Sequence, residues 1–426
     1  MGASLVADLG VGPEVWLFLT LLGCLTIFFK FSRFWSIRNL DLLLLFALAP
    51  GMMMLVGTAG AQPWMAYFWL FLGTTLWLGR CLLDLGLTRR PVLEPNLNAA
   101  GLACLSIGVL ALFVVETVSL SVREGTARNP ADTNPSQREN ADPPGSAEPN
   151  APLNLVVKNA PLTQALKATP HQGLARLLAS LAQVGLVVGL IAVGWRHFDR
   201  PIAGLSVATC YLLLPYARFA LVDSGQLVPA ALIVSALVAY RKPAVAGALI
   251  GLSAGWMPAS FGLLPLWTGF YRGRGMLRFG LVSFGVLGSC ILLGRFVPGM
   301  AQWATALGAR RVLDAGIWPT SDAPPTGSFW SGIDMSYRLP VWIGYLALVI
   351  TTTFWPARKN LGELISTSAA LLVASQFWFL SAGGTLVLLY LPLVILMMFR
   401  PNLGHRRSSP SRPRRERAEG AVRSES

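Results

Sequence analysis

The chain has 426 residues, of which 13% are charged and 54% are hydrophobic. A soluble protein carries roughly 25% charged residues, so this composition excludes an ordinary soluble enzyme and predicts a membrane protein. The formal net charge of +14 does not indicate nucleic-acid binding, because the basic residues form short clusters between apolar runs and one terminal tail. We therefore expect no nucleic-acid partner.

The cysteines and histidines do not form a recognisable chemical motif. All five cysteines lie inside apolar runs, without paired spacing and without histidines nearby. This pattern is typical of reduced packing residues and predicts neither a structural metal site nor a disulfide framework. Nothing in the sequence indicates a cofactor.

Apolar runs long enough to cross a hydrocarbon core about 30 Å thick recur along residues 1–400. The fold class expected is therefore all-α, a polytopic transmembrane helical bundle with about eleven full spans and one broken, re-entrant segment. The expected spans are Val15–Phe31, Leu40–Val56, Trp64–Leu83, Ala99–Leu120, Leu174–Trp195, Ile202–Leu221, Leu227–Tyr240, Leu277–Phe296, Leu339–Trp355, Leu361–Leu380 and Thr385–Phe399.

Basic residues cluster in alternate turns between these spans, which sets the expected orientation because cytoplasmic loops are enriched in Lys and Arg. The N-terminus is expected outside and the C-terminus in the cytoplasm, in a multi-pass protein of a bacterial inner membrane. The basic tail, residues 401–426, is expected to be disordered and to contact anionic membrane lipids. The clusters include Lys30, Arg33, Arg38, Arg89, Arg90, Arg196, Arg200, Arg241, Lys242, Arg272, Arg274, Arg278, Arg358 and Lys359.

One apolar stretch, Ala244–Phe270, contains Pro258 and Pro265 and is flanked on both sides by basic turns. Both of its ends must then lie on the cytoplasmic side. Since the stretch is too short for two full crossings, we expect it to enter the membrane, bend near Pro258 and return.

Two long segments are expected on the outer side. Residues 121–173 are rich in Pro, Asn, Ala, Asp and Glu, a composition typical of a disordered loop. Residues 297–338 mix charged and aromatic side chains, which predicts an amphipathic loop that folds back on the membrane surface.

Charged residues near the span ends have structural interpretations. Arg80 and Asp84 lie four residues apart on one helical face, so a mutual ion pair satisfies both. Asp41 is expected to complement a helix N-terminus, and Glu363, three residues after Asn360, is expected to cap the next one.

The segment Arg218–Gln226 joins two spans with almost no loop and contains Asp223. In one interpretation, Arg218 holds a phosphate and the Asp or Gln holds a sugar hydroxyl. In the other, an Arg218–Asp223 ion pair closes a tight helical hairpin and Gly225 is there for its backbone. The sequence favours neither.

Three glycines, Gly247, Gly251 and Gly255, recur at four-residue spacing and so share one helix face. Such a ridge of small residues lets two helices approach closely in lipid. We expect a helix-packing role.

The second half of the chain contains a longer ordered pattern: Gly225-Gln226, an apolar span, Arg241-Lys242-Pro243, the glycine-rich Ala246–Gly255, Pro258, an apolar run and Arg272-Gly273-Arg274. This order resembles the GT-C superfamily of membrane glycosyltransferases. It is most similar to the branch that uses polyprenyl-phosphate-mannose. The resemblance is confined to this segment, and its elements are of low complexity.

The resemblance implies a GT-C-like fold and the transfer of a sugar from a polyprenyl-phosphate donor at the outer membrane face. Two features depart from the family pattern. Trp256-Met257 stands where the family has a lysine before the proline, and the first closed outer loop, Gly57–Pro63, lacks the acid that serves the family as general base.

The residues expected to serve such an activity lie on the outer side. Asp223 is the candidate catalytic base or a sugar ligand, and Gln226 is a candidate sugar ligand. Candidate phosphate ligands are Arg218, Arg310 and Arg311, and Trp318 suits the headgroup level. We expect the site where Arg218–Gln226 meets the 297–338 loop.

Two other functions fit the sequence. A non-catalytic scaffold or lipid-binding relative of the same fold is favoured by the two departures from the family pattern. A secondary transporter is favoured by the broken segment, although no internal repeat supports it. Whether the chain is an enzyme therefore stays open at the level of sequence.

Overall fold

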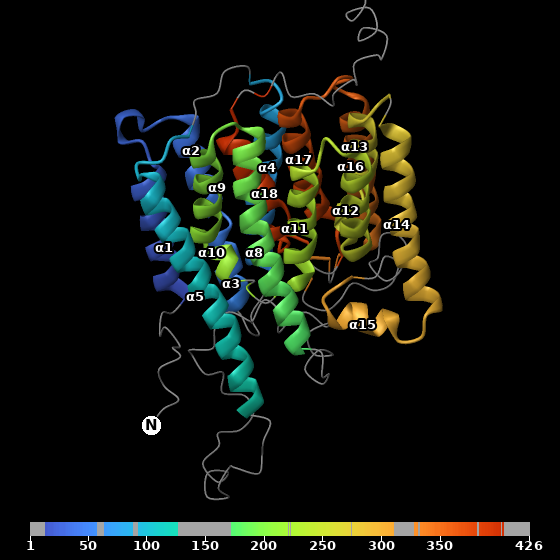
Figure 1. Ribbon diagram of the computed structural model, residues 1–426, viewed down its shortest axis with the longest axis horizontal. Helices are drawn as coiled ribbons and strands as arrows, with labels where there is room; N and C mark the ends of the chain where they lie inside the picture. The colour runs from blue at the N-terminus through green and yellow to red at the C-terminus, as the bar shows by residue number, and fades with distance from the viewer. Residues whose placement is uncertain are drawn as a thin grey trace, which may run out of the picture.

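The structure is a computed structural model, which describes residues 13–57, 64–87, 93–126, 172–219, 221, 223–273, 275–310, 328–330, 333–380, 383–401 and 403. These residues form helices and turns, and no strand occurs among them. The helices lie side by side as a bundle (Figure 1). The expected all-α class is confirmed.

The first part of the bundle consists of α1 (Pro13–Phe28), α2 (Ile37–Phe46), α3 (Ala49–Gly57), α4 (Trp64–Leu83), α5 (Ala99–Thr126), α8 (Gln172–His197), α9 (Pro201–Leu213) and α10 (Pro215–Phe219). The second part consists of α11 (Ser224–Val238), α12 (Pro243–Trp256), α13 (Leu263–Phe270), α14 (Met276–Phe296), α15 (Met300–Ala306), α16 (Arg338–Phe354), α17 (Leu361–Trp378) and α18 (Val387–Phe399). Short 3-10 turns lie at Phe31–Arg33, Pro258–Ser260 and Met335–Tyr337.

Several helices have the length and composition needed to cross a membrane. Among the described residues, five segments qualify: Ile37–Leu55, Trp64–Leu83, Ala99–Thr117, Gly173–His197 and Met276–Phe296. Six shorter apolar helices accompany them. Many large hydrophobic side chains on the outer helices of the bundle are exposed, as lipid contact requires. The chain is therefore a helical membrane protein.

Helix α14 illustrates the fit to a bilayer. Its exposed arginines, Arg278 and Arg295, bracket an uncharged apolar stretch. That stretch is about 25 Å long at the rise of an α-helix, close to the thickness of a hydrocarbon core.

Two expected spans are each divided into two helices. The chain breaks between α2 and α3 at Ala47–Leu48, because Pro50 has no N–H to offer the preceding turn. Trp69 Nε1 donates instead to the Ala47 carbonyl at 2.6 Å. The second break is at Leu214, which is extended because Pro215 follows it.

The proline-broken stretch bends back on itself near Pro258, as expected. Helix α12 ends at Trp256, the chain turns through Pro258–Ser260, and α13 runs back. The Tyr271 hydroxyl after α13 donates to the Tyr240 carbonyl before α12, so the two ends of the stretch are adjacent.

The three glycines of α12 have the packing role expected of them. A Cβ on Gly247 would lie 2.8 Å from the Phe279 carbonyl, and one on Gly251 would overlap the Ser283 carbonyl. Both partners belong to α14, so the ridge holds α14 against the bundle.

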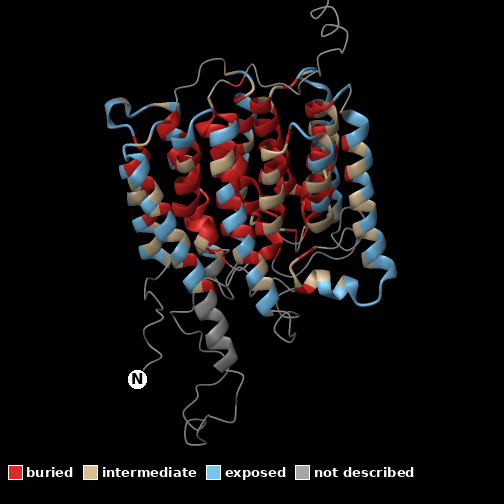
Figure 2. Ribbon diagram, viewed as in Figure 1, coloured by how far each residue is buried: buried red, intermediate tan, exposed pale blue. Residues whose placement is uncertain are grey.

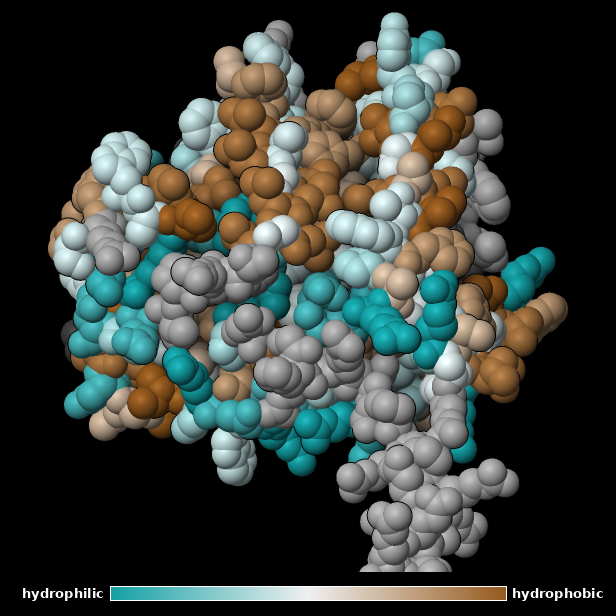
Figure 3. Space-filling view, turned by 90° about the horizontal axis from the view of Figure 1, so that it is seen from above, coloured by the Kyte–Doolittle hydropathy of each residue, from teal (hydrophilic) through white to brown (hydrophobic). Residues whose placement is uncertain are grey.

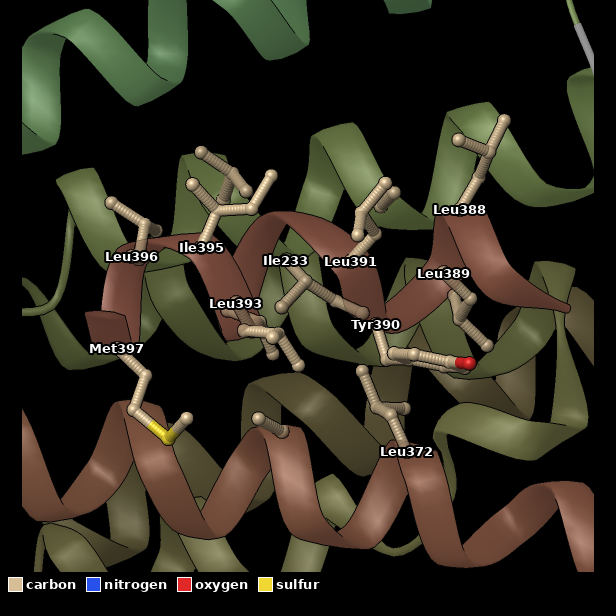
Figure 4. Close-up of a cluster of buried hydrophobic side chains, with 14 of the residues drawn as sticks. Ile233, Leu372, Leu388, Leu389, Tyr390, Leu391, Leu393, Ile395, Leu396 and Met397 are labelled. Carbon is tan, nitrogen blue, oxygen red and sulfur yellow. The ribbon is translucent and has the colours of Figure 1, made fainter. Parts of the chain in front are cut away.

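The core is centred on α18, whose thirteen residues are all buried. A helix that is hydrophobic on every side is expected only where other helices surround it. Ile233 of α11 and Leu372 of α17 pack against the α18 side chains (Figure 4), and exposed residues lie on the outward faces of the surrounding helices (Figure 2).

The basic turns lie together at one end of the bundle, the upper end in Figure 1, which we call the basic end. Contacts between turns support this placement: Arg38 donates to the Glu94 carbonyl at 2.7 Å, and the Arg272 guanidinium lies 5.5 Å from the Phe354 ring centroid. Seen from this end, hydrophilic residues form a band through the middle and lower part of the view, and hydrophobic residues occupy much of the rest (Figure 3).

An ion-pair network at the basic end contains the Arg80–Asp84 pair expected from the sequence and corrects the interpretation of Asp41. Arg80 makes its short contacts with Asp41, at 2.6 and 2.7 Å, and lies 3.4 Å from Asp84. Asp84 pairs at 2.6 Å with Arg400 and accepts a hydrogen bond from Ser366. Asp41 is thus an ion-pair partner and not a helix cap.

The N-termini of α2 and α17 each have a side-chain cap, and neither cap is Asp41. Ser36 caps α2, accepting a hydrogen bond from the Asn39 backbone N–H. The Asn360–Glu363 capping box expected for α17 is confirmed, with both hydrogen bonds present at 2.8 and 2.9 Å.

The long segments expected on the outer side are only partly described. Helix α5 continues to Thr126, beyond the expected span end at Leu120. Residues 127–171, 311–327 and 404–426 lie outside the described residues, so the disorder expected of the first loop and of the tail is not tested. The described part of the 297–338 loop contains α15, which lies across the bundle end opposite the basic end (Figure 1).

Candidate functional site

The start of α11 meets the segment that follows α15. The Ser224 hydroxyl donates to the Leu307 carbonyl at 2.7 Å. Since α11 ends beside the basic end, this junction lies at the opposite end of the bundle. The expected meeting of Arg218–Gln226 with the 297–338 loop is confirmed.

Two glycines make this junction close. A Cβ on Gly225 would lie 2.9 Å from the Gly308 carbonyl oxygen, and a Cβ on Gly308 would overlap the Ser224 hydroxyl. Gly308 also has φ +92°, in the left-handed region that side chains disfavour. The backbones touch because neither position carries a side chain.

Arg310 is fixed by this junction and reaches toward α17. Its backbone N–H donates to the Trp256 carbonyl at the end of α12, at 2.8 Å. Its guanidinium lies 5.5 Å from the Phe379 ring centroid. Burial lowers the pKa of Arg310, and the negative charge of Asp223 opposes that shift, so the two charged groups act on each other.

Asp223 and Gln226 are joined by a side-chain hydrogen bond across the first turn of α11. Gln226 Nε2 donates to Asp223 Oδ2 at 2.8 Å, and Gln226 Oε1 accepts from the Leu388 backbone N–H at 3.1 Å. Gln226 therefore caps the N-terminus of α18 while holding the carboxylate. Both ends of its amide are used within the protein.

Two further polar residues, which were not predicted from the sequence, contact the end of α17 or lie in its last turn. Arg338 is fully buried, and its Nε donates to the Trp378 carbonyl at 3.0 Å. Arg338 and Arg310 thus contact the consecutive residues Trp378 and Phe379. Gln376, also fully buried, accepts from the Leu386 N–H at 3.1 Å.

A polar residue inside an apolar span is a signal that was available for Gln376. Arg338 offered a weaker signal, because an arginine at a span end is ordinary. We call Asp223, Gln226, Arg310 and Arg338 the polar cluster. Its members come from α11, the segment after α15, and the start of α16.

Arg218 belongs to a different set of contacts, so the Arg218–Asp223 ion pair considered from sequence is wrong. Arg218 Nε lies 3.1 Å from Glu116 Oε1, and its guanidinium lies 4.7 Å from the Trp16 ring centroid. Glu116 on α5 pairs with this arginine because α5 and α1 both pack against α9, and α10 follows α9 directly. The contact neutralises a charge at the bundle end.

The other two residues predicted for the site, Arg311 and Trp318, lie outside the described residues. Within the described part of the chain, no group of three His, Cys, Asp or Glu side chains is placed to hold a metal ion.

The polar cluster combines the half-buried carboxylate of Asp223 with the guanidinium groups of half-buried Arg310 and fully buried Arg338. A carboxylate can accept a proton from a hydroxyl within hydrogen-bond reach, and guanidinium groups bind phosphate oxygens in a planar, two-point geometry. The arrangement therefore suits a ligand with an anionic group and a hydroxyl.

Comparisons with known proteins provide no relative for this chain. No family model matches the sequence, and no curated protein or solved structure is significantly similar to it.

Proposed function

We propose that this membrane protein is a GT-C-like glycosyltransferase that transfers a sugar from a polyprenyl-phosphate donor at the end of the bundle opposite the basic end. The observation that carries the proposal is the junction of Ser224 with Leu307, which brings Asp223, just before the family-like segment, within electrostatic range of Arg310. An acid and a cation, both half-buried, are the two groups that transfer from a phosphate-linked donor requires.

In this proposal the acceptor hydroxyl attacks the anomeric carbon of the donor sugar, and the bond between that carbon and the phosphate oxygen breaks. Asp223 takes the proton of the hydroxyl, and Arg310 and Arg338 stabilise the charge that develops on the departing phosphate. Gln226 is better suited to hold Asp223 in position than to bind the sugar, because both ends of its amide are already bonded.

The proposal includes an orientation with the polar cluster outside the cell, an N-terminus outside and a cytoplasmic C-terminus, in about eleven spans. It is supported by the gathering of the basic turns at one end of the bundle. Cysteine labelling after residues 145 and 405 tests it, because labelling of the first position from the cytoplasm would reverse the orientation.

The decisive experiment measures sugar transfer from a series of polyprenyl-phosphate sugars in reconstituted membranes. Asp223→Asn should abolish transfer and leave thermal unfolding nearly unchanged. Arg310→Lys should keep the charge, lose the two-point contact and weaken donor binding. The matched control is Asp334→Asn, which changes an exposed acid of the same loop and should retain activity. Unchanged transfer by Asp223→Asn would contradict the proposal.

A non-catalytic scaffold of the same fold is the second candidate. It is favoured by the contacts of Gln226, which join Asp223 to the N-terminus of α18 and so give the family-like residues a structural role. In that case no donor is turned over, and both Gln226→Ala and Asp223→Ala lower the thermal stability.

A further inference from the structure

The turn between α1 and α2 exposes a cluster of aromatic side chains. Phe31 is 74% exposed, Phe34 61% and Trp35 85%. Their rings contact one another or the buried Phe29, with centroid separations of 5.0 Å for Phe29–Phe31, 5.4 Å for Phe29–Phe34 and 5.8 Å for Phe34–Trp35. The exposed rings therefore form one continuous surface, which we call the aromatic turn.

The shape of the aromatic turn is fixed by buried polar side chains. Asn39 accepts from the Lys30 N–H and donates to the carbonyls of Lys30 and Phe34, each at 3.1 Å. Arg38 donates to the Phe28 carbonyl at 2.8 Å. The rings are held outward by these contacts, so their exposure is a property of the fold.

The aromatic turn continues an exposed apolar surface. Ile37, Leu40 and Leu43 follow it on one side of α2 and are 50%, 48% and 43% exposed. The turn lies at the edge of the bundle and at the basic end, and it is coloured as exposed (Figure 2). Aromatic rings at the end of a lipid-facing helix lie at the level of the headgroups.

The turn also contains two basic residues. Lys30 is exposed, and the sequence places Arg33 between Phe31 and Phe34. We propose that the aromatic turn is a binding site for the headgroups of anionic phospholipids in the leaflet at the basic end. The rings insert at the interface, and the two cations contact the lipid phosphates.

A second copy of this chain is a poorer occupant of this surface. In a two-fold contact the same patch faces itself, which would bring the Lys30 and Arg33 charges of the two copies together. An anionic headgroup neutralises these charges, and acyl chains cover the apolar side of α2 that continues from the turn.

The test uses the full-length protein in bilayers that contain equal amounts of phosphatidylglycerol and phosphatidylcholine. One of the two lipids carries brominated acyl chains that quench nearby tryptophan. The contribution of Trp35 is obtained by subtracting the fluorescence of the Trp35→Phe variant from that of the unchanged protein. We expect brominated phosphatidylglycerol to quench this difference more strongly than brominated phosphatidylcholine does. Lys30→Gln with Arg33→Gln should remove the preference, reducing a local enrichment of up to about 30-fold, equivalent to about 1 kcal/mol for each cation.

The matched control is Trp195 of α8, an exposed tryptophan followed by Arg196 in the last turn of that helix. Its quenching should not respond to the Lys30 and Arg33 substitutions. Equal quenching of Trp35 by both lipids would refute the proposal, and so would a preference that survives the double substitution. Protection of Trp35 from both lipids together with a dimer that the substitutions dissociate would assign the surface to a second copy.

Discussion

Asp84 Oδ2 and Arg400 Nη2 lie 2.6 Å apart, although the two residues are 316 positions apart in the sequence. Arg80 and Asp41 extend this contact into a network of two acids and two arginines, all with side chains at most 14% exposed. The network joins α2 and α4 to the end of α18, and the Ser366 hydroxyl on α17 donates to its Asp84.

Removal of one member should be costly because it leaves an uncompensated buried charge. Arg400→Met or Asp84→Asn alone should destabilise the folded protein by about 3 to 5 kcal/mol. The double variant restores neutrality and should recover much of that loss. Thermal unfolding in one detergent measures the effect, with exposed Arg358→Ala as a control that changes stability by at most about 0.5 kcal/mol. Additive losses in the double variant would show that the pair does not act as a unit.

The contact between α12 and α14 should depend on which glycine is changed. Gly251→Ala places a methyl group where the Ser283 carbonyl lies, so the helices must separate and the protein should lose stability. Gly288→Ala on α14 has open space around its Cβ and should be neutral or slightly stabilising, because alanine favours a helix over glycine by about 1 kcal/mol. Thermal unfolding of the two variants tests the comparison, and equal effects would contradict the packing.

Lys359 should give the protein a distinctive pH dependence. Its ammonium donates to the carbonyls of Thr353 and Pro356 at 2.9 and 3.0 Å. Burial lowers the pKa of Lys359 to about 8, the charge of Arg272 adds to the shift, and Glu363 opposes it. Below that pH the lysine is protonated in both the folded and unfolded states, so the cost of burying its charge is fully present.

Between about pH 8 and the ordinary lysine pKa, the unfolded state binds the proton and the folded state does not. Stability should therefore rise as the pH rises through this window. Thermal unfolding of the protein and of Lys359→Met, compared at each pH, isolates the contribution. Arg272→Gln should raise the pKa of folded-state Lys359 and so narrow the window from its lower end. A difference between protein and variant that is independent of pH would contradict the assignment.

The capping box of α17 should contribute a measurable share of stability. Asn360→Ala removes the acceptor for the Glu363 backbone N–H and should cost about 1 kcal/mol. Asn360→Asp keeps an acceptor at the same place and should cost much less. Hydrogen exchange at the Glu363 amide reports directly on the cap, and unchanged protection in Asn360→Ala would be inconsistent with it.

Local features of the fold were predictable from the sequence. The Asn360–Glu363 box, the glycine ridge of α12 and the break near Pro258 each depend on residues a few positions apart. Apolar runs likewise identify helices, because a backbone in lipid must satisfy its own hydrogen bonds. For such features the spacing of residues along the chain is enough to predict which backbone and side-chain groups lie close together.

The partners of the charged residues were decided only by the tertiary structure. Arg218 had Asp223 as its nearest acid in sequence but pairs with Glu116, and Asp84 pairs mainly with Arg400. Arg338 belongs to the polar cluster because its side chain donates to the Trp378 carbonyl at the end of α17. Each choice depends on which helices are neighbours, and that follows from packing over the whole bundle. Sequence spacing determines which residues share a helix face. It does not determine which other helix lies against that face, so the partner in an interhelical contact is known only from the tertiary structure.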